Sequence, residues 1–340
     1  MKMGKHLVSV VMPIYNDWEY LGESIDSILA QTYVDWEMLL LVEHGCDQRC
    51  LDVISEFKDP RMLLFRNAER LGLPRSLNRG IALSHGDFIA RMDSDDISLP
   101  TRLEKQVKLL VENREVGVCG TYAEVFGLQS WKYGNESTDA EVKVGLLLGC
   151  PIVHPSVMMR KSLIVEKGLY YNENISEAED YELWSRTIWQ TKIVNIPEIL
   201  VKYRKHENNK TVYVDVGDRL VEHSVMAAML KHAGMPEVSV EDINLHFEIF
   251  LGSGISVANS KRTILWCEMI ERRNRARKEY DESVLIDRLN IIFIAACFHQ
   301  NILRSVYCLL RSALFWRTSN KRKVQLFGKL IARILAKLRR

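Results

Sequence analysis

The chain contains 340 residues, which is long enough for one large domain or for two domains of moderate size. Hydrophobic residues make up 47% of it and charged residues 26%, a composition that excludes a largely disordered chain. Because 46 basic side chains nearly balance 44 acidic ones and leave a net charge of +2, we expect no nucleic-acid partner.

Apolar β-branched runs alternate with segments of helical periodicity through the first hundred residues. The predicted strands are residues 7–14, 36–42, 61–66 and 87–92, and the predicted helices are residues 17–31, 47–57, 73–84 and 98–113. Asn16 and Glu19 have the spacing of a capping box at the start of the first helix. Short connections indicate parallel βαβ units and an α/β fold. Ligands bind beyond the carboxyl ends of such strands, which directs attention to residues 13–17, 43–47 and 93–96.

The pattern is mixed after residue 115 and helical beyond about residue 210. Strands are predicted at 116–126, 154–160, 193–194 and 199–204, and helices at 176–190, 215–232, 241–251, 261–279 and 282–317. We therefore predict two domains, residues 1–210 and residues 211–340.

The seven cysteines are scattered, the first six residues are polar, and no 18-residue run lacks charge. We expect reduced thiols, no signal peptide, no membrane span and a cytoplasmic location.

Three carboxylates, those of Asp93, Asp95 and Asp96, occupy one turn directly after an apolar strand. Like charges this close raise one another's pKa values, and a divalent cation with oxygen ligands relieves the repulsion. Carboxylate ligands suit Mg²⁺ or Mn²⁺. Aspartate also favours turns and helix starts, so a solvated turn is the alternative. The position at a parallel strand's carboxyl end favours a metal–phosphate site.

A second acidic cluster opens the helix predicted at residue 176. Ser176 and Glu179 have the spacing of a capping box, which gives Glu179 a structural role. Asp180 lies beside Leu183 and Trp184 on the helix surface, where partial desolvation would let it act as a base near neutral pH. A solvated aspartate in the first helical turn is the alternative.

Several stretches in fixed order resemble the family 2 inverting glycosyltransferases. They include SLNRGIALSHGDFIARMDSDD (76–96), HPSVMMRK (154–161) and EAEDYELWSR (177–186), together with residues 8–16, 27–42 and 99–107. The resemblance covers about the first 205 residues. It implies a GT-A fold, in which a nucleotide-binding parallel sheet joins a mixed acceptor-binding part.

The resemblance also implies roles for individual residues. Asp93 and Asp95 correspond to the Asp-x-Asp pair that holds a divalent metal, Mn²⁺ or Mg²⁺, and the sugar nucleotide. Asp180 corresponds to the catalytic base, the second residue of the Glu/Asp-Asp motif. The other positions are Pro13, Tyr15 and Glu43 at the nucleoside, His206 at the metal or diphosphate, and His154, Glu179 and Trp184 on the acceptor side. A solvated loop histidine is the alternative for His206, and a hydrogen-bonded core histidine is the alternative for His154.

One segment departs from the family pattern. The family commonly has Val-Asp-Asp-Gly-Ser after the second strand, where this chain has Val42-Glu43-His44-Gly45-Cys46. The carboxylate of Glu43 is one methylene longer and can still accept a hydrogen bond from a base N–H of uracil or guanine. A UDP-sugar is the favoured donor.

The implied reaction is a single displacement that inverts the anomeric centre, so an α-linked donor gives a β-linked product. The metal neutralises the leaving diphosphate while Asp180 takes a proton from an acceptor hydroxyl.

The last 24 residues, 317–340, carry nine Lys or Arg and no Asp or Glu. Apolar residues recur at helical spacing among them, which predicts a basic amphipathic helix suited to an anionic membrane surface. A terminal helix packed on the domain is the alternative. A membrane-bound tail would favour a lipid-linked acceptor, such as a polyprenyl-diphosphate saccharide of O-antigen or capsule assembly, and a peripheral location at the cell membrane.

Other functions stay open. A GT-A-fold protein that binds a nucleotide sugar without transferring it is the main alternative. A hydrolase or nucleotidyltransferase usually has a Gly-rich or basic phosphate loop near the N-terminus, which residues 13–17 lack. No GxGxxG motif follows the first strand, which argues against a dinucleotide-binding oxidoreductase.

Overall fold

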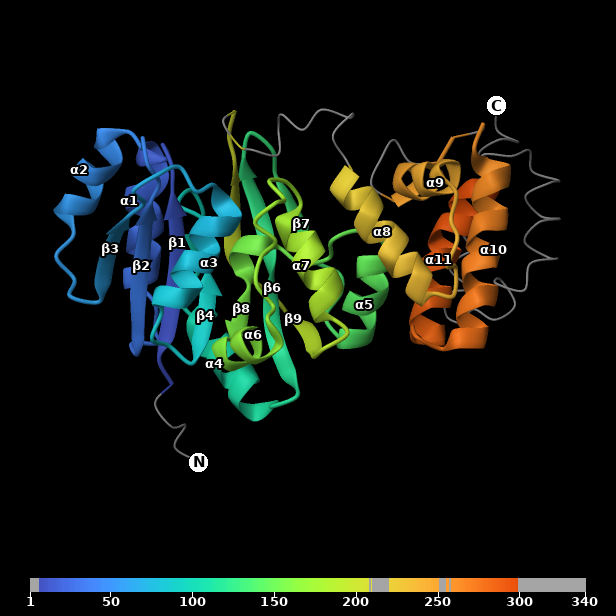
Figure 1. Ribbon diagram of the computed structural model, residues 1–340, viewed down its shortest axis with the longest axis horizontal. Helices are drawn as coiled ribbons and strands as arrows, with labels where there is room; N and C mark the ends of the chain where they lie inside the picture. Colours follow the sequence, from blue (N-terminus) through green and yellow to red (C-terminus); the bar gives the residue numbers. More distant parts are fainter. Residues whose placement is uncertain (1–5, 208, 210–219, 251–254, 257, 299–340) are drawn as a thin grey trace, which may run out of the picture. The chain divides into compact units, whose positions relative to one another are not determined.

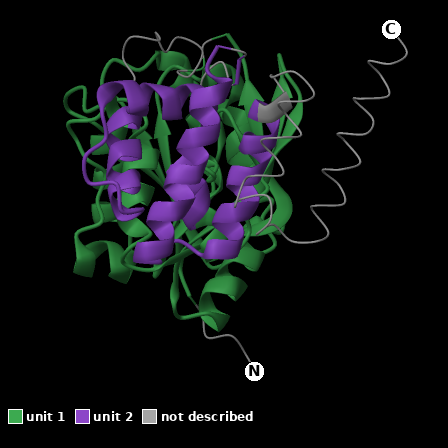
Figure 2. Ribbon diagram, turned by 90° about the vertical axis from the view of Figure 1, so that its right-hand side faces the viewer, with its two compact units in different colours: residues 1–142, 150–221 green, residues 143–149, 222–340 purple. Residues whose placement is uncertain are grey.

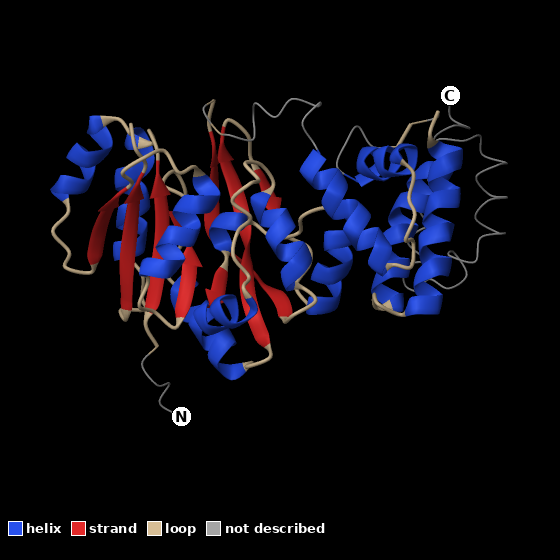
Figure 3. Cartoon of the chain, viewed as in Figure 1, coloured by secondary structure: helices blue, strands red, loops and turns tan. Residues whose placement is uncertain are grey.

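Nine strands form one mixed sheet in the part of the chain that the computed structural model describes, which is residues 6–207, 209, 220–250, 255–256 and 258–298 (Figures 1 and 3). The chain folds into two compact units, residues 1–142 with 150–221 and residues 143–149 with 222–340 (Figure 2). The domain boundary near residue 210 stays a prediction, because residues 210–219 lie outside the described range.

The parallel part of the sheet has the strand order β3-β2-β1-β4. These strands are β1 (Val8–Ile14), β2 (Trp36–Val42), β3 (Met62–Arg66) and β4 (Phe88–Arg91). Ile14 pairs with Val42, and Val11 pairs with Arg91, so β1 and β2 end level with each other. The loops that follow these strands therefore share one edge of the sheet.

The sheet continues from β4 through β8, β6 and β9 to β5. These are β5 (Ile97–Ser98), β6 (Val116–Gly127), β8 (Met158–Arg160) and β9 (Lys192–Lys205), with β7 (Trp131–Tyr133) paired to β6. β8 is antiparallel to β4 and β6, whereas β6 and β9 are parallel along most of their length. β5, which follows β4 in the chain, pairs with Lys202 and Val201 of β9. The end of β9 therefore lies at the edge of the sheet at which β4 ends.

Helices cover both faces of the parallel strands. Side chains of β1 that point to one face, such as Val10 and Met12, share a core with α1 (Trp18–Leu29), α2 (Gln48–Glu56) and α4 (Arg102–Glu112). The other face packs on α3 (Leu73–Leu83), where a Cβ at Gly80 would lie 2.4 Å from Val11 Cγ1. The missing side chain lets α3 approach the sheet closely, and the predicted α/β layering is confirmed.

The remaining helices of the first unit are α6 (Lys161–Lys167) and α7 (Glu179–Thr187), while α5 (Asp139–Leu148) has residues in both units. The second unit also contains all but the first two residues of α8 (Leu220–His232), together with α9 (Val240–Phe250), α10 (Ser260–Arg277) and α11 (Glu282–Phe298). The predicted helical C-terminal region is confirmed over these residues. Within the described residues, the helices are too short or too polar to cross a bilayer. The predicted basic helix at residues 317–340 lies outside the described range.

Several local predictions were wrong. α1 takes Asp17 as its N-cap, because Asn16 adopts a left-handed φ of 64° and its side chain accepts the Asp47 N–H instead. α7 begins later than predicted, with Ala178 as its N-cap, so Ser176 and Glu179 form no capping box. Residues 154–156 form a 3₁₀ turn rather than strand, and the two extended pieces predicted between 193 and 204 belong to one strand.

Candidate active site

Three loops after parallel strands build the first part of the site. The loop after β1 contains Tyr15 and Asp17, the loop after β2 begins with Glu43, and the turn after β4 is Asp93–Asp96. The strands themselves are almost fully buried, so these polar residues appear where each strand leaves the core. Pro13 lies within β1, paired with Leu41 of β2.

Hydrogen bonds from α1 and α4 fix the acidic turn. The hydroxyl of Ser24 donates to the backbone carbonyls of Asp96 (2.7 Å) and Ser94 (2.9 Å). The buried guanidinium of Arg102 donates to the carbonyl of Arg91 (2.8 Å). The turn therefore has a defined backbone, which helps to pre-organise its carboxylates.

The three carboxylates of the turn converge. Oxygen atoms of Asp93, Asp95 and Asp96 lie within 4.8 Å of one another. Burial raises the pKa of Asp93 to about 6, although its ion pair with Arg91 opposes the shift. Burial and the neighbouring carboxylates raise the pKa of Asp96 well above its ordinary value. A bound cation would stabilise all three anions at once.

The donor atoms fit a divalent metal. Asp96 Oδ1 accepts the backbone N–H of Arg204 (2.8 Å), while its fully buried Oδ2 has no hydrogen-bond partner among the described residues. Hard oxygen ligands of this kind suit Mg²⁺ or Mn²⁺. The carboxylates predicted from the sequence are thus brought together around an unsatisfied oxygen.

The end of β9 places His206 on the same cluster. His206 Nε2 lies 2.9 Å from Asp95 Oδ2, and Asn209 Nδ2 donates to the same oxygen at 3.2 Å. The His206 ring packs on Tyr20, with the ring centroids 4.8 Å apart. His206 is 9% exposed, so it is a buried neighbour of the acidic turn rather than a solvated loop histidine.

Sequence reasoning missed two members of this cluster. Asp17 lies in the loop after β1 and accepts a hydrogen bond from the Ser94 hydroxyl (2.6 Å). Burial raises the pKa of Asp17, and the charge of Asp95 adds to the shift. Asp17 lay inside a loop that the strand pattern singled out, whereas no sequence signal identifies Asn209.

Glu43 is buried at the base of the β2 loop. Its carboxylate accepts the backbone N–H groups of Leu71 (3.0 Å) and Gly72 (2.8 Å). Burial alone would raise the pKa of Glu43, but these hydrogen bonds lower it below the ordinary value. Tyr15 is 39% exposed at the same edge, with the Arg70 guanidinium 4.9 Å from the ring centroid. The Tyr15 ring and the Arg70 guanidinium offer flat surfaces at the sheet edge.

A second cluster surrounds Asp180 at the start of α7. Asp180 Oδ1 accepts the backbone N–H of Tyr181 (2.7 Å), and Cys150 Sγ lies 3.9 Å from Oδ2. Burial and the adjacent charge of Glu179 raise the pKa of Asp180 to about 7. A carboxylate with this pKa can accept a proton near neutral pH.

The predicted acceptor-side residues gather at this second cluster. His154 Nδ1 lies 3.8 Å from Glu179 Oε1, and His154 Nε2 lies 2.8 Å from the Tyr171 hydroxyl. The Trp184 ring meets His154 edge-on, with the ring centroids 6.3 Å apart. Trp184 is fully buried, so it can influence an acceptor only through its neighbours.

Arg91 connects the two clusters electrostatically. It is 4% exposed and forms an ion pair with Asp93. Its positive charge also lowers the pKa of Asp180, against the larger effects of burial and Glu179. The charge of Arg91 therefore acts both on the acidic turn, through Asp93, and on Asp180.

Asn78 is a further residue that the sequence pattern did not single out. Its side chain on α3 accepts the backbone N–H of Tyr171 (3.0 Å) and donates to the carbonyl of the same residue (2.9 Å). These two hydrogen bonds fix the backbone of Tyr171, whose side-chain hydroxyl contacts His154. The partners are far apart in sequence, and no local pattern marks them.

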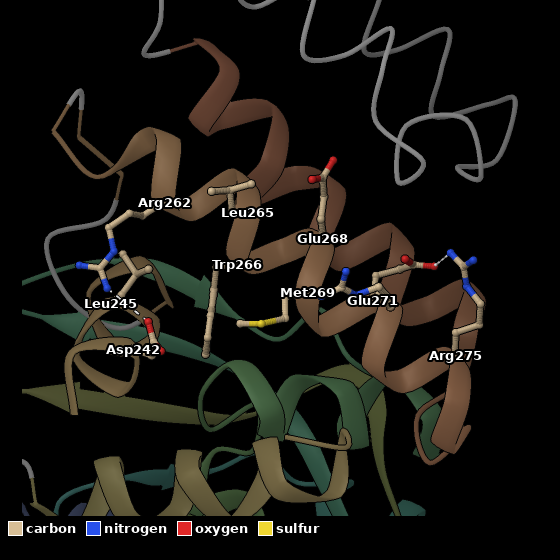
Figure 4. A pocket seen from close by; sticks show the side chains of 10 residues that line it. Asp242, Leu245, Arg262, Leu265, Trp266, Glu268, Met269, Glu271 and Arg275 are labelled. Atoms are coloured by element: carbon tan, nitrogen blue, oxygen red, sulfur yellow. Dashed lines mark hydrogen bonds and ion pairs between the residues drawn. The ribbon is translucent and has the colours of Figure 1, made fainter. Parts of the chain in front are cut away.

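A groove in the helical unit has a different character. It measures about 650 Å³ between α9 and α10 and includes Trp266 (Figure 4). Asp242 pairs with Arg262 (3.3 Å), and Glu271 pairs with Arg275 (2.6 Å). These are ordinary ion pairs of helix surfaces. The sheet edge gathers carboxylates with raised pKa values, so we place the candidate active site there.

The chain is similar to known glycosyltransferases. The family model "Glycosyl transferase family 2" matches residues 9–164. The O-antigen biosynthesis glycosyltransferase WbnJ of Escherichia coli is 31% identical over 219 residues, which cover 60% of this chain and 81% of that protein. The UDP-Glc:alpha-D-GlcNAc-diphosphoundecaprenol beta-1,3-glucosyltransferase WfgD of Escherichia coli is 30% identical over 209 residues, which cover 61% and 80%.

The fold is also similar to a solved structure. TarS residues 1–349 of S. aureus, in complex with UDP-GlcNAc, matches with a TM-score of 0.58 and 14% sequence identity, covering 85% of this chain and 88% of that chain. At this identity the likeness concerns the fold alone, and it confirms the expected GT-A architecture.

Proposed function

Since this chain belongs to glycosyltransferase family 2 and is a glycosyltransferase of the bacterial surface-polysaccharide type, we propose that it is a metal-dependent inverting enzyme. It transfers a sugar from a nucleotide sugar to a saccharide hydroxyl. The observation that carries the proposal is the pairing of a convergent carboxylate cluster with a carboxylate of pKa about 7, both acted on by the charge of Arg91.

Asp93, Asp95 and His206 are the proposed metal-binding residues. A divalent ion held there would neutralise charge on the leaving diphosphate, which is the chemistry that the resemblance predicts. The buried, unsatisfied Oδ2 of Asp96 and the contact between His206 and Asp95 support this assignment. Mg²⁺ and Mn²⁺ both fit oxygen ligands of this kind.

Asp180 is the proposed catalytic base. Its carboxylate takes the proton of the acceptor hydroxyl as that oxygen attacks the anomeric carbon from the face opposite the diphosphate. Glu179, His154 and Trp184 form the proposed acceptor side around it. The hydrogen bond between His154 and Tyr171 fixes the imidazole ring next to Glu179.

Pro13, Tyr15 and Glu43 form the proposed nucleoside site, and a UDP-sugar is the favoured donor. The name of WfgD supports this choice, since that relative uses UDP-Glc. The exposed Tyr15 ring supplies a surface on which a base can stack.

A lipid-linked saccharide is the proposed acceptor. The name of WfgD supports this class, because that relative acts on a diphosphoundecaprenol-linked sugar. The basic, apolar residues of 317–340 would hold the protein at the cytoplasmic face of an anionic membrane, where such an acceptor resides.

The testing experiment measures thermal stabilisation of the full chain by UDP, GDP and dTDP, each with and without Mn²⁺. We expect a metal-dependent rise in Tm with one nucleotide, and its loss in Asp95→Ala. Glu104→Ala, which removes a carboxylate of α4 outside the site, serves as the matched control. Absence of a shift with every nucleotide would refute the proposal. A shift without sugar transfer to a lipid-linked acceptor would favour the non-transferring alternative.

A further inference from the structure

The Glu43 carboxylate is surrounded by hydrogen-bond donors of its own chain. Oε1 accepts the backbone N–H of Leu71 (3.0 Å), the backbone N–H of His44 (3.0 Å) and Asn67 Nδ2 (3.2 Å). Oε2 accepts the backbone N–H of Gly72 (2.8 Å). Three of the four donors belong to residues 67–72, the loop that joins β3 to α3.

These donors occupy most of the hydrogen-bond acceptor sites of the Glu43 carboxylate. Two carboxylate oxygens offer about four lone-pair sites, and four donors face them, three at Oε1 and one at Oε2. A fifth contact, the Ser76 hydroxyl at 3.4 Å, faces Oε2. Glu43 is also only 9% exposed. To reach Glu43, a nucleobase N–H would have to displace a backbone donor or the Ser76 hydroxyl, and the displaced buried donor would lose its hydrogen bond.

The loop held by Glu43 carries a residue that faces the nucleoside site. Arg70 directly precedes Leu71, and its guanidinium lies 4.9 Å from the centroid of the Tyr15 ring. Arg70 is exposed, so its position depends on the backbone that Glu43 fixes. By holding this loop, the Glu43 carboxylate determines where the Arg70 guanidinium lies beside the exposed Tyr15 ring.

We propose that Glu43 is a positioning residue of the nucleoside site: it holds the 67–72 loop so that Arg70 stays over Tyr15, and it does not itself accept a hydrogen bond from the base. The proposal rests on the proposed function, because it assumes a nucleotide at Tyr15. It also accounts for the longer side chain at this position. An aspartate is one methylene shorter, and its carboxylate would fall short of the amides of Leu71 and Gly72.

The experiment compares four variants of the full chain: Glu43→Asp, Glu43→Gln, Arg70→Met and the control Glu69→Gln, which removes an exposed charge from the same loop. Hydrogen–deuterium exchange without nucleotide reports on residues 67–76. Titration with UDP and with N3-methyl-UDP, both with Mn²⁺, reports on base recognition.

We expect faster exchange of residues 67–76 in both Glu43 variants and a loss of UDP affinity of about tenfold or more, because charge-assisted hydrogen bonds are lost. Arg70→Met should weaken UDP binding without faster exchange, and Glu69→Gln should match the wild type. N3-methylation should weaken binding by the same factor in wild type and in Glu43→Gln.

Three results would overturn the inference. They are unchanged exchange in Glu43→Gln, full UDP affinity in Glu43→Asp, and an N3-methyl effect that disappears in Glu43→Gln, which would mean direct reading of the base. If the wild type binds none of UDP, GDP and dTDP, the proposed function fails and this inference fails with it. Nucleotide binding by the wild type with any of the three results overturns the inference alone.

Discussion

Replacing Asp180 by Asn should lower activity and raise stability at the same time. The amide retains an oxygen that can accept the Tyr181 N–H, so the start of α7 should be preserved. It cannot take a proton from the acceptor hydroxyl. Loss of a general base typically slows a reaction by about 10²- to 10⁴-fold, and we expect kcat to fall by that amount. UDP binding should be unchanged, because Asp180 belongs to the acceptor-side cluster.

The stability effect follows from the raised pKa. Burial and Glu179 raise the pKa of Asp180 from 3.8 to about 7, so the folded state binds this proton more tightly than the unfolded state does. The ionised carboxylate therefore costs stability, and the cost grows as the pH rises from about 4 to about 7 and is complete above 7. Three pKa units correspond to at most about 4 kcal/mol, which Asp180→Asn should recover in part at pH 8. At pH 5 the gain should shrink to less than about 2 kcal/mol.

Thermal unfolding of wild type and Asp180→Asn at pH 5 and pH 8, together with a transfer assay across the same range, measures both effects. Wild-type kcat/KM should fall as the pH drops below about 7, because the base becomes protonated. Glu166→Gln, which removes an exposed carboxylate of α6 outside the site, is the control and should show neither effect. A variant with normal turnover would refute the base assignment, and equal Tm differences at the two pH values would refute the burial argument.

Two further predictions concern the acceptor and the membrane. Asn78→Ala should raise the acceptor KM several-fold with little change in the donor KM, because it releases the backbone of Tyr171. Steady-state kinetics with each substrate varied in turn would measure this, and an equal rise in both KM values would contradict it. A chain that ends near Ser319 should sediment less with anionic liposomes than the full chain does, since it lacks eight of the nine basic tail residues, and equal sedimentation would contradict membrane binding by the tail.

The sequence predicted the parallel sheet accurately because each buried strand is a continuous apolar run. Residues 36–42 were predicted and are β2, and the predicted helix 73–84 differs from α3 by one residue. β5 and β7 were missed because two- and three-residue strands exist only through pairing with distant partners. Local periodicity carries no information about such pairing.

The candidate site was predicted in part. The acidic turn and Asp180 follow from local patterns and the family resemblance, and the structure places His206 beside Asp95. Asp17 and Asn78 could not be predicted in these roles, because their partners lie far away in sequence. The capping boxes failed because the left-handed residues Asn16 and Ala178 shift where the two helices begin.

The residues that stabilise the sheet and the polar residues of the candidate site lie in different segments of the chain. The apolar side chains of β1, β2 and β4 stabilise the sheet, whereas the loops that follow them carry the polar groups. The polar residues of those loops can therefore change while the apolar residues of the core stay the same. The segment Glu43–Cys46, which departs from the common family sequence, follows a strand whose buried residues are all apolar. The sheet and the polar loops can therefore be altered independently of each other at these positions.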